Sequence, residues 1–80
     1  MSPTVMYIGP YRLYFFSREE ARMHVHIDTP TGQAKFWLEP IISLADYTGK
    51  VTKKELQKLQ QSVEDNHAEI EKAWKKHFKT

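Results

Sequence analysis

The chain has 80 residues, of which 40% are hydrophobic and 28% are charged, and its formal net charge is +2. This length provides for one domain with one small core. The absence of cysteine excludes disulfide bonds and zinc–thiolate sites, and the small net charge does not by itself indicate a nucleic-acid-binding protein. No apolar run approaches the ~20 residues of a membrane-spanning helix, and the segment MSPTVMYIGPYR lacks the features of a signal peptide. We therefore expect a soluble, cytoplasmic protein.

The first half of the chain is typical of a β-sheet. Short runs rich in β-branched and aromatic residues are separated by turn-forming segments, among them Gly9-Pro10 and residues 29–32. The polar segment 17–23 has the composition of a loop. We expect four strands, over residues 4–8, 11–16, 23–28 and 33–38.

The second half is typical of a helix. Pro40 should end the sheet, and residues 41–45 are predicted to form a short helical turn within a connection over residues 41–50. Thr52 and Glu55 have the spacing of a capping box. The apolar residues that follow recur every three or four positions, at Leu56, Leu59, Val63, Ile70 and Trp74. This pattern predicts one long helix over residues 52–78 that covers one sheet face with its apolar stripe. A kink near residues 65–67 is the alternative.

A pair of histidines, His24 and His26, is the most informative feature of the sequence. Residues two positions apart on a strand project from the same face. Lys35, Trp37 and Glu39 follow at the same alternating spacing in the next predicted strand. A hairpin between the two strands would bring imidazole, ammonium, indole and carboxylate groups onto one face of the sheet.

Three interpretations of the histidine pair are open. Both rings could ligate a metal, with Asp28, Glu39 or the remote His67 and His77 supplying a third ligand. They could act as general acid and base, because imidazole titrates near neutral pH. The default is that one ring is structural and the other contacts a partner, so we expect no metal and no cofactor. The catalytic candidates are His24, His26 and Lys35, and the binding candidates are Arg12, Arg22, Trp37 and Glu39.

The order of the segments carries a resemblance. PTVMYIGPYRLYFFS, HVHI, GQAKFWLEP and KKELQKLQQSVEDNHAEIEKAWKKHF, in that order, resemble a small bacterial family, domain of unknown function 4160, nearly end to end. One departure is Arg22-Met23, where the family typically has a proline before the first histidine. Members are often encoded beside a small protein of the domain of unknown function 2442 family, and such pairs look like toxin–antitoxin modules. The resemblance therefore implies a protein partner and assigns no catalytic residue.

We expect an α+β fold, with a mostly antiparallel four-stranded sheet packed against a long C-terminal helix. The first functional hypothesis is a component of a toxin–antitoxin-like module that binds a small cognate protein. In that case, part of the helical stripe should be exposed in the isolated chain. The second is a metal-independent ribonuclease that uses His24 and His26, with Lys35, Arg12 or Arg22 stabilising charge. The third is a nucleic-acid-binding autoregulatory module that uses Arg12, nearby aromatic residues and the C-terminal lysines. RNA and a second copy of the chain are further partners that the sequence allows, and no membrane contact is expected.

Overall fold

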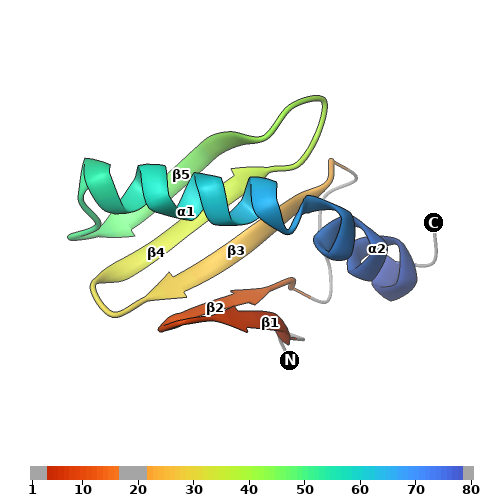
Figure 1. The fold of residues 1–80 in the computed structure, drawn as a ribbon, viewed down its shortest axis with the longest axis horizontal. Helices are drawn as coiled ribbons and strands as arrows, with labels where there is room; N and C mark the ends of the chain where they lie inside the picture. Colours follow the sequence, from red (N-terminus) through yellow and green to blue (C-terminus); the bar gives the residue numbers. More distant parts are fainter. Residues whose placement is uncertain (1–3, 17–21, 79–80) are drawn as a thin grey trace.

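The computed structural model describes residues 4–16 and 22–78, which form an α+β fold (Figure 1). The fold class predicted from the sequence is therefore confirmed. A five-stranded sheet has the order β1-β2-β3-β4-β5, and every neighbouring pair of strands is antiparallel. The elements are β1 (Thr4–Ile8), β2 (Tyr11–Tyr14), β3 (His24–Thr29), β4 (Gly32–Trp37), β5 (Ser43–Gly49), α1 (Lys53–Asp65) and α2 (His67–Phe78).

Strand β5 lies where the sequence predicted a helical turn, so that prediction and the count of four strands are wrong. Ser43 pairs with Trp37, and Asp46 pairs with Lys35, along the outer edge of β4. A helix of only a few residues does not compensate for the cost of its nucleus. Pairing with β4 instead satisfies the backbone hydrogen-bonding groups along the edge that the two strands share. Ile41, the first residue of the predicted helical turn, is 71% exposed.

The C-terminal helical region is broken at Asn66, so one continuous helix is wrong and the alternative of a kink holds. Asn66 has φ −115° and ψ 18°, far from α-helical values. Its side-chain amide donates a hydrogen bond to the Ser62 carbonyl at 2.8 Å, a local bond of the kind that competes with helix continuation. A straight helix over residues 52–78 would be about 40 Å long, which exceeds the 34 Å longest dimension of the Cα trace. Among the described residues, no helix is long and apolar enough to cross a membrane.

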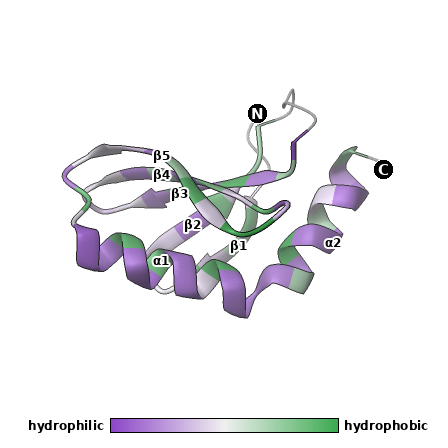
Figure 2. Ribbon diagram, turned by 90° about the horizontal axis from the view of Figure 1, so that it is seen from above, coloured by the Kyte–Doolittle hydropathy of each residue, from purple (hydrophilic) through white to green (hydrophobic). Residues whose placement is uncertain are grey.

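Both helices lie on the same side of the sheet, and the core fills the space between the two layers (Figure 2). The predicted stripe supplies the helical side of this core. Leu59, Val63 and Ile70 have no exposed surface, Trp74 is 4% exposed, and Leu56 is half-buried. The sheet contributes the alternating side chains of its inner face, including Leu13, Val25, Ile27 and Phe36. The expectation of a partly exposed stripe is therefore not met at its four main positions, although the stripe does cover one sheet face.

Candidate functional site on the open face of the sheet

The side of the sheet away from the helices, here called the open face, carries most of the predicted site residues. The predicted hairpin between the histidine strand and the lysine–tryptophan strand is present. His24 is the cross-strand partner of Trp37, and His26 is the partner of Lys35. Strand β2 adds Tyr14 opposite His26. The side chains of the open face are Arg12, Tyr14, Phe16, His26, Asp28, Gln33, Lys35 and Trp37.

His24 is enclosed at the end of β3 and has no exposed surface. Its Nδ1 atom lies 2.7 Å from the carbonyl oxygen of Arg22. Its ring centroid lies 5.5 Å from that of Trp37 and 5.2 Å from that of Trp74, so α2 reaches this imidazole. The predicted catalytic candidate His24 is therefore a packed side chain in this structure, and solvent does not reach it.

His26 is half-buried and lines a hollow of about 210 Å³ on the open face. Its ring stacks on Tyr14 with a centroid separation of 5.4 Å and meets Phe16 edge-on at 4.5 Å. Lys35 and Asp46 also line this hollow. The neighbouring His24 ring is 5.1 Å away, at nearly a right angle. The two histidines are thus close together, and their exposures to solvent are very different.

Trp37 is covered by two cations. The guanidinium carbon of Arg22 lies 4.1 Å from the indole centroid, and the ammonium nitrogen of Lys35 lies 4.5 Å from it. Both distances are within the range of a cation–π interaction. Three residues predicted from the sequence, Arg22, Lys35 and Trp37, therefore form one cluster beside His26.

Arg12 lies at the other end of the open face, in a polar network around Asp28. Its guanidinium is 3.5 Å from an Asp28 oxygen and lies over the Tyr14 ring at 4.5 Å. The hydroxyl of Tyr14 and the side-chain amide of Gln33 donate hydrogen bonds to Asp28 at 3.1 and 3.0 Å. These bonds fix the positions of the Arg12 and Tyr14 side chains on the face.

Glu39 follows β4, and its contacts hold the segment that leads into β3. Its carboxylate accepts a hydrogen bond from the Met23 backbone N–H at 3.1 Å. Its backbone carbonyl accepts one from the Arg22 side chain at 3.0 Å. Glu39 therefore positions Arg22 over Trp37, and it is not brought into the hollow that His26 lines.

Asp46 and Tyr47 line the same hollow and are functional candidates that sequence reasoning missed. The cause is the misassignment of residues 41–45 as a helical turn, which removed β5 from the predicted sheet. The available signal was the β-favouring pair Tyr47-Thr48 directly before Gly49. With β5 in place, Asp46 is the cross-strand partner of Lys35.

The open face offers one half-buried imidazole, an ammonium group and several aromatic rings, and this set suits binding or proton transfer. The part of the chain that the structure describes holds no group of three or more His, Asp or Glu residues that could bind a metal ion. The histidine pair therefore has no third ligand from the described residues. An imidazole next to a cation can act as a general base toward an anionic substrate.

Comparison with known proteins gives a match to a family model. The family model described as Domain of unknown function (DUF4160) matches residues 11–75, which include β2 to β5, α1 and most of α2. No curated protein and no solved structure is significantly similar to the chain. The match covers most of the chain, including His24, His26 and the Lys35–Trp37 segment. The chain therefore belongs to the DUF4160 family.

Proposed function

We propose that this protein is the binding component of a two-protein, toxin–antitoxin-like module, and that it binds its small cognate partner through the open face. The observation that carries the proposal is the group of partly exposed aromatic and cationic side chains on the side of the sheet without helices. Phe16 is 44% exposed, and Lys35 and Trp37 are half-buried. Aromatic residues and arginine are enriched in protein interfaces, and Arg22 and Trp37 already form such a pair.

The packing of the rings favours a protein partner over a nucleic acid. Nucleic-acid bases stack on aromatic side chains that present a free face. Cations lie over the Trp37 ring, and Tyr14 is buried between Arg12 and His26. A base would have to displace these groups, whereas a protein surface can pack over them as they stand.

The buried helical stripe counts against docking through the helices, because this function was expected to leave part of the stripe exposed. Leu59, Val63, Ile70 and Trp74 are used inside the domain, so they do not supply a docking surface in the folded chain. The family resemblance supplies the expected partner, a small protein encoded next to this one. The partner should present an apolar or acidic surface to the cations and rings of the open face.

The test is to co-express the chain with the small protein encoded beside its gene and to measure the affinity of the purified pair by calorimetry. The double variant Phe16→Ala/Lys35→Ala should weaken binding at least tenfold, about 1.4 kcal/mol. Lys72→Ala removes one exposed ammonium from α2 and should change the affinity less than twofold. Failure to form a complex, or equal affinity for all three proteins, would contradict the proposal. Circular dichroism of each variant verifies folding.

The second candidate function is the metal-independent ribonuclease, with His26 and Lys35 in place of the His24/His26 pair expected from the sequence, because His24 has no exposed surface. Cleavage of RNA needs a proton-transfer group and a cation near the phosphate that reacts, and these two residues face each other across β3 and β4. Expression of the chain alone should then arrest growth, and folded His26→Ala and Lys35→Ala variants should not. Growth arrest that persists in both variants would exclude this chemistry. If neither the wild-type chain nor the variants arrest growth, the binding role is the one that stands.

A further inference from the structure

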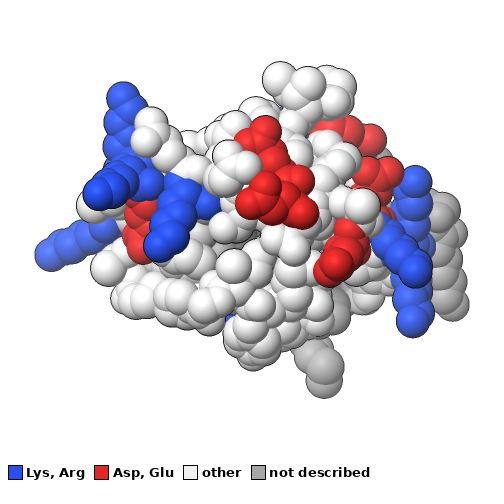
Figure 3. All heavy atoms as spheres, viewed as in Figure 1, with Lys and Arg blue, Asp and Glu red and all other residues white. Residues whose placement is uncertain are grey.

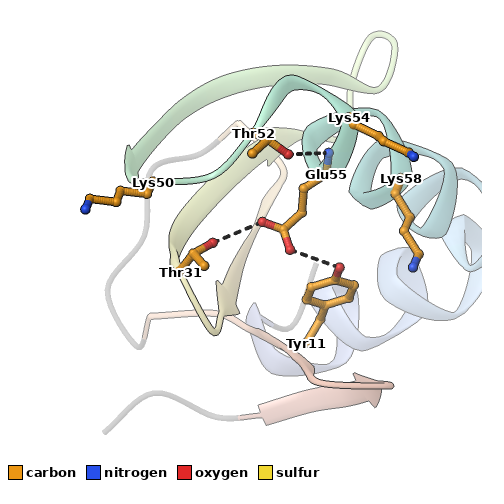
Figure 4. A pocket seen from close by; sticks show the side chains of 7 residues that line it. All are labelled: Tyr11, Thr31, Lys50, Thr52, Lys54, Glu55 and Lys58. Atoms are coloured by element: carbon orange, nitrogen blue, oxygen red, sulfur yellow. Dashed lines mark hydrogen bonds between the residues drawn. The ribbon is translucent and has the colours of Figure 1, made fainter.

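A groove of about 570 Å³ lies where α1 begins, beside the turn between β3 and β4 (Figure 4). This volume is within the range of small-molecule sites. The groove shares no lining residue with the hollow of the open face. The side chains that matter for its chemistry are Tyr11, Thr31, Lys50, Lys54, Glu55 and Lys58.

The Glu55 carboxylate is held in place at this groove by two hydroxyl groups. Tyr11 donates to one of its oxygens at 3.2 Å, and Thr31 donates to the other at 3.1 Å. The backbone N–H of Glu55 donates to the Thr52 hydroxyl at 3.1 Å, which fixes the start of the helix. A carboxylate oxygen can accept more than one hydrogen bond, so each oxygen retains capacity for a donor from a ligand.

Three lysines, Lys50, Lys54 and Lys58, line the groove, and none of these described residues forms an ion pair with Glu55. The ion pairs among the described residues join Arg12 to Asp28 and join Glu71 to His67 and Lys75. None of them involves Lys50, Lys54 or Lys58. Figure 3 shows Lys and Arg side chains gathered at this end of the molecule. Figure 4 shows Lys54 and Lys58 on α1 beside Glu55, and Lys50 extending away from Glu55. Flexible ammonium groups of this kind bind phosphate as point charges.

We propose that this groove binds a small phosphate ester that also carries hydroxyl groups, that is, a sugar phosphate or a nucleotide. Lys54 and Lys58 would bind the phosphate, and Glu55 would accept hydrogen bonds from the hydroxyl groups. Bare phosphate would be repelled by the Glu55 carboxylate, and an uncharged sugar would gain nothing from the lysines. Recognition therefore requires a phosphate and hydroxyl groups on one molecule. This proposal does not depend on the proposed function of the open face.

The test is a titration of the full ¹⁵N-labelled chain, followed by amide chemical shifts at low ionic strength, where electrostatic binding is strongest. The probes are ribose 5-phosphate and adenosine 5′-monophosphate, with ribose and inorganic phosphate as the comparison ligands. Both esters should give saturable shifts near Thr31 and Glu55 at millimolar concentration, and each should bind at least tenfold more tightly than either comparison ligand. The tighter of the two esters identifies the source as sugar phosphate or nucleotide.

Two pairs of substitutions with equal charge loss make the test specific. Lys54→Ala/Lys58→Ala should weaken ester binding at least tenfold. Lys53→Ala/Lys76→Ala removes two exposed lysines that do not line the groove, and it should change the affinity less than twofold. The proposal is overturned if neither ester gives saturable shifts, if inorganic phosphate binds as tightly as the esters, or if both double variants lose affinity equally.

Discussion

His26 and Lys35 stand directly opposite each other across β3 and β4. Tyr14 on β2 and Asp46 on β5 extend the same row across the sheet. A shift of one residue in strand pairing would turn a whole strand's side chains to the other face. The register that places apolar side chains against the helices therefore also assembles this row, so the core and the candidate site depend on the same strand pairing.

The two histidines should differ in their contribution to stability. His24 has no exposed surface and packs against two tryptophans, whereas His26 is half-buried beside the hollow. His24→Ala should lower the free energy of unfolding by about 2–4 kcal/mol through a cavity and a lost hydrogen bond. His26→Ala should cost about 1 kcal/mol or less. Urea unfolding followed by tryptophan fluorescence measures both values, and equal costs would contradict the difference in packing.

The helical stripe should supply much of the stability of the domain. Leu59 has no exposed surface, so Leu59→Ala should lower the free energy of unfolding by about 2–5 kcal/mol. Leu44 on β5 is 37% exposed and serves as the matched control. Leu44→Ala should cost less than about 1 kcal/mol. Thermal and urea unfolding give the two values, and a small cost at Leu59 would mean that α1 is not packed as described.

Tyr11 should make stability depend on pH in the alkaline range. Burial of its hydroxyl and the nearby Glu55 carboxylate, which also accepts its hydrogen bond, raise the pKa of Tyr11 above its ordinary value of 10.0. Because the pKa is higher in the folded chain than in the unfolded chain, the contribution of Tyr11 to stability is complete below pH 10 and is lost as pH rises through the folded pKa.

Comparison of the wild-type chain with Tyr11→Phe isolates this contribution from the titration of the lysines. The variant should be less stable by about 1–2 kcal/mol at pH 8, because it lacks the hydrogen bond to Glu55. The difference in the free energy of unfolding should shrink as pH rises above 10 and through the folded pKa of Tyr11. Urea unfolding at a series of pH values measures the difference, and one that stays constant or grows with pH would contradict the assigned origin of the shift.

The sequence by itself determined which residues share a face. Alternation along two strands placed His24, His26, Lys35 and Trp37 on one face, while the pairing of His26 with Lys35 and of His24 with Trp37 comes from the structure. The helical spacing identified Leu59, Val63, Ile70 and Trp74 as the buried stripe. These patterns follow from the local geometry of strands and helices, so they can be recognised from neighbouring positions. The capping pair Thr52 and Glu55 was likewise visible, and the Thr52 hydroxyl accepts the Glu55 backbone N–H.

Only the tertiary structure decided what covers each face. β5 formed because β4 offered an edge to pair with, and the break at Asn66 lets α2 turn toward the end of the sheet. That turn brings Trp74 against His24 and buries this imidazole, while its neighbour His26 stays half-buried on the open face. Periodicity indicates which side chains point the same way. Burial depends on contacts between segments that are distant in the chain, and these contacts exist only after the whole domain has packed.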